Sequence, residues 1–352
     1  MHNPADLEGN RFRRRIRHIH VGVREKSSSI KAVRIHSHGG PEVLKLEEVP
    51  VPRPGSGEVL VRNHAIGVNF VDTYLRSGAF APPAMPFIPG KEAAGEVLAV
   101  GPGVHDFAPG DRVAFVETLG AYAEQTVAPA HFLVHLPDAI KYETAAASML
   151  KGLTAQYLLR RTFRVEPGHI VLVQAAAGGV GTILTQWAKH LGATVIGTVG
   201  STEKAAMARK NGCDHVIEYH REDFAVRVKE ITDGKGCHVV YDGVGKATFP
   251  HSLDCLRPFG YFVSYGFSSG TIPPFDIMLL LEKGSLFATW PGLTMYLADR
   301  KDVLSMSQEL FDVIASGAVK IPPPTQLPLA EAAEAHRRLE ARETNGATVL
   351  LT

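Results

Sequence analysis

Cysteine is scarce in this sequence, and its spacing excludes a disulfide framework. The 352 residues include three cysteines, Cys213, Cys237 and Cys255, which are well separated along the chain and form no CxxC pair. The 16 histidines form no HExxH pattern and pair with no cysteine at the spacing of a zinc finger, so no structural zinc site is predicted. Three separate thiols fit a reducing compartment.

Long apolar runs and an excess of one charge are also absent. No segment reaches about 18 apolar residues without a charge, and the N-terminal region lacks the apolar run of a secretory signal, so neither a membrane span nor export is predicted. The 37 basic and 36 acidic residues give a net charge of +1, which provides no electrostatic basis for binding nucleic acid or an anionic membrane. We therefore expect a cytoplasmic protein.

The N-terminal region departs from this charge balance. Residues 1–30 hold seven lysines or arginines against three acidic residues. We interpret residues 1–29 as a disordered, solvated basic extension without a catalytic role, or as the product of an upstream start site. An organelle-targeting peptide and a nucleic-acid-binding tail are the alternatives.

The length and the turn content predict two domains. A chain of 352 residues is about twice as long as a typical domain, and 34 glycines and 23 prolines indicate many turns. Between residues 30 and 137, short β-type runs are separated by turn signals, which is typical of a partly open barrel. After residue 141, apolar strands alternate with helices, as expected for a parallel sheet covered on both faces. Helices are predicted at 144–159, 204–210, 223–231, 249–256 and 303–316, and a Pro-rich strand at 321–328.

These patterns together predict an α/β fold. A β-rich domain is expected over residues 30–150, and a cofactor domain over residues 151–299. The segment 300–352, which ends in a helix and an apolar strand, is expected to return to the first domain and complete it.

A glycine-rich turn carries the strongest functional signal. Residues 171–181, VLVQAAAGGVG, run from an apolar strand through a glycine turn into a helix. Small residues at such a turn let the backbone approach a dinucleotide pyrophosphate, whose charge the helix N-terminus attracts. Ala176 stands at the first glycine position of GxGxxG, and Gly178 and Gly181 keep the other two. A glycine-rich turn that binds no ligand is the alternative.

The residues after the next strand indicate the type of dinucleotide. A site for NADH usually has an Asp or Glu about 20 residues after the glycine turn, where it holds the ribose hydroxyls. Val199 occupies this position, and it is followed by Gly200, Ser201 and Lys204, whose amide, hydroxyl and ammonium groups suit a 2′-phosphate. The sequence therefore favours NADPH. The alternative is that Lys204 is a solvated helix residue.

Short motifs along the chain resemble those of one enzyme family. They are HGGPEVL (38–44), GVNFVDTYLRSG (67–78), PGKEAAGEV (89–97), PGDRVAF (109–115), LKGLTAQYLL (150–159), AAAGGVG (175–181) and YDGVG (241–245). In this order they resemble the zinc-free quinone oxidoreductases, the zeta-crystallin-like branch of the medium-chain dehydrogenase/reductase superfamily. The resemblance covers residues 30–352. It implies a GroES-like catalytic domain made from both ends of the chain, a Rossmann doubly wound parallel sheet between them, and reduction of a quinone or enone by NADPH.

The resemblance also implies that the catalytic domain holds no metal. Zinc alcohol dehydrogenases of the same superfamily carry a Cys ligand in the segment that corresponds to NFVDTY, and a GHE motif where this chain has Gly90, Lys91 and Glu92. Both ligands are missing here. Hydride addition to an electrophilic quinone needs less Lewis-acid help than alcohol oxidation does. We expect Lys91 and Glu92 to form a structural ion pair or a solvated turn.

The resemblance places further residues around the cofactor. Asn69, Asp72 and Tyr74 are expected beside the nicotinamide, where they position cofactor and substrate. The whole expected cofactor site comprises Asn69, Lys151, Thr154, Ala177, Gly178, Gly179, Val180, Gly181, Ser201, Lys204, Tyr219, Val244, Tyr265, Gly266, Phe267 and Arg342. Alternatively, Tyr74 is a hydrogen-bonded core residue and Arg342 a cation on a helix surface. Several relatives have Tyr at the position of Phe80, so one phenol that contacts substrate is absent.

We therefore interpret the protein as an NADPH:quinone reductase whose chemistry is mainly positioning. Solvent can protonate the oxygens of a reduced quinone, so no essential acid or base is expected. The enzymatic alternative is an enone, alkenal or 2-enoyl thioester reductase, which must protonate a carbon and for which Tyr74 is the nearest donor. The non-enzymatic alternative is an NADPH-binding crystallin-like or RNA-binding protein.

One apolar segment bears on assembly. Residues 284–290, GSLFATW, are predicted to form the last strand of the cofactor-domain sheet, with an open edge. In the family that this chain resembles, such strands join across a two-fold axis. We therefore expect a homodimer with one continuous sheet, and an internal strand capped by a loop is the alternative.

Overall fold

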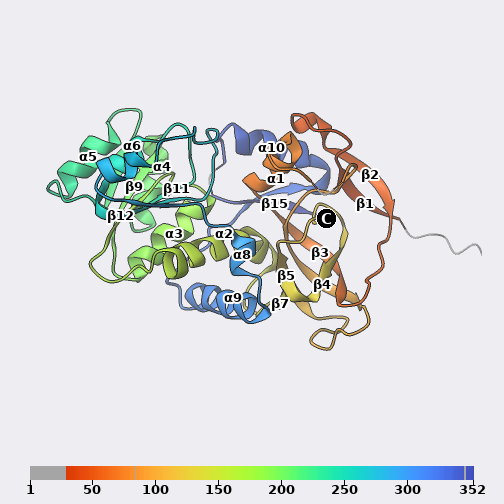
Figure 1. Cartoon of the computed structure of the whole chain (residues 1–352). Coiled ribbons are helices and arrows are strands. Elements are labelled where there is room, and N and C mark those ends of the chain that lie inside the picture. Colours follow the sequence, from red (N-terminus) through yellow and green to blue (C-terminus); the bar gives the residue numbers. More distant parts are fainter. Residues whose placement is uncertain (1–28, 83, 345) are drawn as a thin grey trace, which may run out of the picture.

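Two large sheets organise the computed structural model, which describes residues 29–82, 84–344 and 346–352 (Figure 1). A small third sheet pairs β1 (Ser29–Arg34) with β2 (Lys45–Pro50) in antiparallel orientation. The interpretation of residues 1–29 as a basic extension lies outside the described residues, apart from Ser29. Within those described residues, none of the helices combines the length and the apolar character that crossing a membrane requires.

A mixed seven-stranded sheet forms the first of the two large sheets. Its strands are β3 (Glu58–Val68), β4 (Glu92–Val100), β5 (Arg112–Val116), β6 (Gln125–Pro129), β7 (Leu133–His135), β14 (Thr325–Pro328) and β15 (Thr348–Leu351). The order is β14-β15-β3-β4-β5-β7, and β6 also pairs with β3. The C-terminal strand β15 thus lies in this sheet beside β3, next to the N-terminal strands (Figure 1). The Pro-rich strand is shorter than predicted, because prolines 322–324 have no N–H to donate to a ladder.

A parallel sheet of six strands forms the second. Its strands are β8 (Ile170–Val173), β9 (Thr194–Val199), β10 (His215–Glu218), β11 (Cys237–Asp242), β12 (Leu256–Ser264) and β13 (Phe287–Thr289), in the order β10-β9-β8-β11-β12-β13. Alternate residues of β8 pack on opposite faces, because successive strand side chains point in opposite directions. Val171 and Val173 pack with residues of α3 (Gly179–His190), whereas Leu172 packs with residues of α5 (Phe224–Ile231) and α6 (His251–Asp254). This doubly covered sheet confirms the predicted α/β class.

A buried helix connects the two sheets. Helix α2 (Tyr142–Tyr157) begins two residues before its predicted start and continues into a π-helical turn at Leu158–Thr162. A Cβ at Gly67 of β3 would lie 2.3 Å from the Ala146 carbonyl oxygen, so the missing side chain lets the helix rest directly on the strand. Helix α2 carries Leu150, Lys151 and Thr154 to the space between the sheets.

The other helices surround these sheets (Figure 1). They are α1 (Phe70–Ser77), α4 (Thr202–Lys210), α7 (Met278–Glu282), α8 (Leu293–Tyr296), α9 (Arg300–Ala315) and α10 (Ala332–Glu340), with short 3-10 turns at Pro41–Val43, Ala130–Phe132 and Leu329–Glu331. Helix α6 is half as long as the predicted helix 249–256, since Pro250 lies at its N-terminal boundary and β12 begins at Leu256.

Candidate functional site

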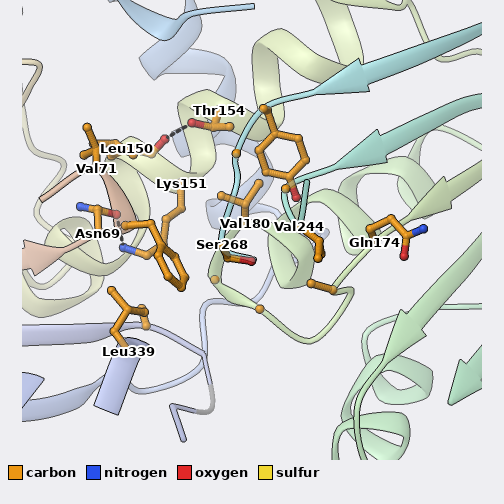
Figure 2. Close-up of a pocket in the computed structure, with 18 of the residues that line it drawn as sticks. Asn69, Val71, Leu150, Lys151, Thr154, Gln174, Val180, Val244, Ser268 and Leu339 are labelled. Carbon is orange, nitrogen blue, oxygen red and sulfur yellow. Dashed lines mark hydrogen bonds between the residues drawn. The ribbon is translucent and has the colours of Figure 1, made fainter. Parts of the chain in front are cut away.

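A cavity of about 630 Å³ lies where α2, the turn between β8 and α3, and the C-terminal segment meet (Figure 2). It is lined by most of the residues that the sequence predicts for the cofactor site. These are Asn69, Tyr74, Lys151, Thr154, Ala177, Gly178, Gly179, Val180, Lys204, Tyr219, Val244, Tyr265, Gly266 and Arg342. Four predicted residues do not line it: Asp72, Gly181, Ser201 and Phe267.

The glycine turn forms one wall of the cavity. Gly178 is the N-cap of α3, and Gly178, Gly179 and Val180 line the cavity, so the first helical turn, whose amides have no partner within the helix, lies at the cavity wall. Gly181 lies behind the wall, where a Cβ would be 2.3 Å from the Ala175 carbonyl oxygen. The alanine at the first glycine position is accommodated by a second glycine: a Cβ at Gly197 of β9 would lie 2.7 Å from the Ala176 methyl.

A basic corner closes the cavity beyond β9. Val199 ends that strand and provides no carboxylate, as the sequence predicts. The Lys204 ammonium donates a hydrogen bond to the carbonyl oxygen of Arg342, over 2.8 Å, and thereby ties α4 to the C-terminal segment. Tyr219 lines the same corner. Ser201 is exposed outside the cavity, where its hydroxyl caps α4 by accepting a bond from the Lys204 amide at 3.2 Å.

A buried polar cluster around Asn69 and Lys151 forms another part of the cavity wall (Figure 2). The Lys151 ammonium is 2.7 Å from Asn69 Oδ1 and 3.6 Å from Glu92 Oε2. Glu92 also accepts hydrogen bonds from Asn69 Nδ2 at 2.8 Å and from the Leu150 amide at 2.6 Å. Burial raises the pKa of Glu92, and the Lys151 charge opposes this shift. The predicted solvated turn at Glu92 is wrong, since Glu92 is fully buried and holds Lys151 in place.

Asp72 lies behind this cluster and does not face the cavity. Its Oδ2 accepts a hydrogen bond from the Asn69 amide at 2.9 Å and another from the Tyr122 hydroxyl at 3.1 Å. Burial raises the pKa of Asp72 to about 7. The expected contact of Asp72 with a nicotinamide therefore has no support here, and its contacts fix the start of α1, and with it Asn69, instead.

A chain of hydrogen bonds extends from Asp72 to α10. Arg76 Nη1 lies 3.0 Å from His336 Nδ1, and His336 Nε2 lies 2.9 Å from the Tyr122 hydroxyl. Since Arg76 can only donate, the network assigns the imidazole proton to Nε2. Burial and the Arg76 charge lower the pKa of His336 to about 3, so the imidazole is neutral. This hydrogen-bond network could not be predicted from the sequence, because α10 and α1 lie near opposite ends of the protein.

Tyr74 lines the cavity and is also hydrogen-bonded within the fold, as its alternative interpretation as a core residue requires. Its ring lines the cavity and stacks on Phe267 at a centroid distance of 3.9 Å, while its hydroxyl accepts a hydrogen bond from the Phe267 amide at 3.2 Å. Phe80 packs edge-on against both rings and also faces the cavity. Burial raises the pKa of Tyr74. Phe267 thus supports the cavity wall from behind.

The structure corrects the predicted pairing of Lys91 with Glu92. The Lys91 ammonium is bonded to Glu117 Oε2 at 2.9 Å, and both residues line the cavity. Thr294 of α8 donates to the same Glu117 oxygen at 2.5 Å. Among the residues that the structure describes, no three His, Cys, Asp or Glu side chains are grouped so as to hold a metal ion.

A parallel sheet with a glycine turn at the carboxyl end of β8, beside a second β-rich domain, defines a dinucleotide-dependent oxidoreductase. Comparison with known proteins agrees. The family model "Alcohol dehydrogenase GroES-like domain" matches residues 55–138, and "Zinc-binding dehydrogenase" matches residues 179–308. The quinone oxidoreductase of Pseudomonas aeruginosa is 50% identical over 322 residues, which cover 91% of this chain and 99% of that protein. The chain belongs to the quinone oxidoreductase family of the medium-chain dehydrogenase/reductase superfamily, which confirms the resemblance and the fold predicted from sequence.

Two further relatives bear on cofactor and substrate. The crystal structure of Escherichia coli quinone oxidoreductase complexed with NADPH superposes with a TM-score of 0.90 at 47% identity, and covers 92% of this chain and 100% of that one. A 2-haloacrylate reductase from a Burkholderia species is 48% identical over 329 residues, 92% of this chain and 99% of that protein.

Proposed function

We propose that the protein is an NADPH-dependent reductase that transfers hydride to quinones without zinc. The observation that carries this proposal is the cavity itself, which runs from the glycine turn and the basic corner to the Asn69, Lys151 and Tyr74 side chains. The first domain, residues 30–150 completed by 300–352, would hold the substrate, and residues 151–299 would hold the cofactor. We further propose a cytoplasmic location.

Three parts of the wall fit three parts of NADPH. The amides at the start of α3, around Gly178, would hold the pyrophosphate. Lys204 and Tyr219 would bind the 2′-phosphate in the corner that lacks a carboxylate. Asn69 and Lys151, which Glu92 holds in place, would position the nicotinamide end. The bound cofactor supplies the hydride, and the surrounding side chains orient the two reactants and exclude water.

Turnover in the presence of a chelator tests this function. NADPH oxidation is measured with 1,4-benzoquinone and 9,10-phenanthrenequinone, with and without EDTA, together with the metal content of the purified protein. We expect turnover to survive chelation and the metal content to stay far below one zinc per chain. Loss of turnover in EDTA that added zinc restores would contradict the zinc-free mechanism.

Reduction of an activated alkene is the second candidate, and the 48% identity to a 2-haloacrylate reductase favours it. This reaction adds a proton to carbon, so it requires a donor, and Tyr74, which lines the cavity, has a hydroxyl that could donate one. A panel of quinones, 2-chloroacrylate, alkenals and 2-enoyl thioesters, compared by kcat/KM, separates the two functions. A kcat/KM for any alkene that exceeds all the quinone values would replace the proposed substrate class.

The basic corner predicts a cofactor preference. We expect NADPH to bind at least about tenfold more tightly than NADH, a difference of roughly 1.4 kcal/mol, because Lys204 provides a cation and Val199 no carboxylate. Lys204→Ala should narrow the preference, whereas Lys210→Ala at the exposed end of the same helix should leave it unchanged. Dissociation constants from fluorescence titration check this expectation. Equal constants for the two cofactors in the unmutated protein would rule out the assignment.

We also propose that a second copy of this chain pairs with the edge of the parallel sheet. Strand β13 pairs with β12 and is the outermost strand on its side, and Phe287 is 50% exposed. Other large apolar side chains between residues 275 and 295 are exposed as well: Phe275, Ile277, Met278, Leu281, Trp290 and Met295. An open, apolar strand edge favours association, and pairing across a two-fold axis would cover it.

Phe287→Pro is expected to weaken this association. Proline removes one amide donor from β13 and cannot continue a ladder, so the mass from light scattering at micromolar concentration should fall toward the 38.0 kDa of one chain. Phe287→Glu, which keeps the amide, should shift the mass in the same direction through charge alone. Unchanged NADPH affinity controls for folding. A monomeric unmutated protein would exclude the proposed dimer.

A further inference from the structure

Lys91, Glu117 and Thr294 form a polar cluster in the wall of the cavity, separate from the cluster around Lys151. Lys91 precedes β4, Glu117 follows β5 and Thr294 belongs to α8, so three segments converge there. The Lys91 side chain is 22% exposed and the Glu117 side chain 8%. Glu117 thus holds Lys91 by its ammonium, and the lysine still reaches the cavity.

The backbone of Glu117 has an unusual conformation. Glu117 has a φ of +57°, in the left-handed region that glycine occupies at lower cost. A residue other than glycine keeps this backbone conformation where surrounding contacts hold it, and such strain clusters at functional sites. Here the two contacts are the Lys91 ammonium and the Thr294 hydroxyl, both on Glu117 Oε2.

The Lys91 ammonium keeps donors for a ligand. In the part of the chain that the structure describes, Glu117 is its hydrogen-bond partner, and an ammonium has three N–H groups. Lys151, the ammonium at the other polar cluster, differs in this respect. It faces Asn69 Oδ1, the Val68 carbonyl oxygen and Glu92, which use its donors. Lys91 is therefore an ammonium group in the cavity wall that keeps donors for a ligand, as far as the described residues show.

We propose that Lys91 binds the substrate oxygen that becomes negative during reduction and gives it a proton. The inference rests on the proposed quinone reductase function. Hydride addition to a quinone produces a hydroquinone monoanion, with the negative charge on one oxygen. A Lys91 N–H bond then breaks as the O–H bond forms, which leaves neutral hydroquinone and a neutral amine. The amine regains a proton from water, so atoms and charge balance. Lys91 thus supplies the charge stabilisation that zinc provides in metal-dependent relatives.

Substitution of Lys91 tests the catalytic role. Lys91→Met should lower kcat/KM for 1,4-benzoquinone by about 10²-fold, as expected for loss of a charged group that also donates a proton, and change the NADPH dissociation constant less than twofold. Lys91→Arg keeps the positive charge, so its kcat/KM should fall less than that of Lys91→Met. Lys189→Met is the matched control, because it removes a different ion pair, with Asp214 at 2.5 Å, on the surface. Its kcat/KM should be unchanged.

A ligand that changes colour on ionisation tests the charge without turnover. 4-Nitrophenol is titrated into the protein in the absence of NADPH, and the phenolate absorption band is recorded. We expect binding as phenolate in the unmutated protein and in Lys91→Arg, and as neutral phenol in Lys91→Met. Glu117→Gln should bind the phenolate at least threefold more tightly, because the charge of Lys91 is no longer offset. If Lys91 and Glu117 had only a structural role, Lys91→Met and Glu117→Gln would both bind 4-nitrophenol more weakly.

The outcomes separate this inference from the function on which it rests. Absence of turnover with every quinone would refute the proposed function, and the nitrophenol spectra would still test Lys91. Turnover of Lys91→Met within twofold of the unmutated protein, with an unchanged phenolate band, would overturn the inference and leave the function standing. If Lys91→Met does not fold, Glu117→Gln decides: tighter phenolate binding supports the inference, and unchanged or weaker binding overturns it.

Discussion

Replacing Lys151 by methionine is expected to lower the free energy of unfolding by about 3–5 kcal/mol at neutral pH. The Lys151 and Glu92 side chains are 8% and 0% exposed, with 3.6 Å between ammonium and carboxylate. Removing the ammonium leaves the Glu92 carboxylate buried, with only the amides of Asn69 and Leu150 as donors. A buried charge without its counter-charge is among the most destabilising single changes in a protein.

The loss of unfolding free energy in Lys151→Met should grow as the pH rises. Burial raises the pKa of Glu92 above its ordinary value of 4.5 in the folded state, and loss of Lys151 raises it further. A carboxyl group with a raised folded pKa stabilises fully below its unfolded pKa, and this stabilisation is lost as pH rises through the folded pKa. Lys151→Met should therefore be least destabilised near pH 4.5 and increasingly so toward pH 8.

Urea unfolding at a series of pH values checks this expectation. The double variant Glu92→Gln, Lys151→Met serves as the control, because a neutral amide at position 92 removes the buried charge. It should recover most of the stability at pH 8 and show a flatter pH profile than the single variant. A deficit that is equal at all pH values, or a double variant no more stable than Lys151→Met, would show that Glu92 is not the cause.

A methyl group at Gly181 is expected to weaken NADPH binding at least about 100-fold, roughly 2.7 kcal/mol. The new Cβ would lie 2.3 Å from the Ala175 carbonyl oxygen and 2.9 Å from backbone atoms of Ala176. Backbone cannot turn away as a side chain can, so the glycine turn and the first turn of α3 must shift together. Melting temperature and the NADPH dissociation constant of Gly181→Ala measure the effect.

Gly178→Ala is the matched comparison for this prediction. Gly178 has a φ of −75°, which alanine adopts readily, and its Cβ would meet the Ala175 oxygen at 3.2 Å, so the fold should persist. The methyl group would occupy the wall of the cavity, however, and we expect an affinity loss of about tenfold with little change in melting temperature. Equal affinity of Gly181→Ala and the unmutated protein would refute the close packing described for this turn.

Local patterns in the sequence predicted the parts of the site that short segments build. The strand, glycine turn and helix around Gly178 follow one another directly, and the absence of a carboxylate at Val199 is visible from spacing alone. The space for the Ala176 methyl group, which Gly197 provides, was not predictable from such local patterns. Gly197 makes room for that methyl from the neighbouring strand, and nothing in the sequence marks one glycine in a strand as the partner of an alanine in an earlier turn.

Long-range pairs explain the predictions that failed. Lys91 and Glu92 are adjacent in sequence and of opposite charge, which suggested an ion pair, but Lys91 lies in the bend before β4 while Glu92 is the first residue of that strand, and the two side chains meet different partners. Glu92 turns into the interior toward Lys151, and Lys91 meets Glu117 and, through it, Thr294 from the far end of the cofactor domain. Asp72 was placed beside the cofactor by the family resemblance, and the sequence did not show that the distant, buried Tyr122 would be its hydrogen-bond partner.

The place of β15 in the first sheet has a consequence for biosynthesis. Thr348 pairs with Val68, so most of the chain must be translated after β3 before the last residues of that strand, 65–68, have a partner on this side. At roughly 5–20 residues per second, this delay is on the order of tens of seconds. All the strands of the parallel sheet lie between Ile170 and Thr289, and they leave the ribosome earlier than β15 does. In the nascent chain, residues 65–68 of β3 thus keep an unpaired edge beyond the part that β6 pairs, and this edge is open to chaperones and to aggregation until the last strand arrives.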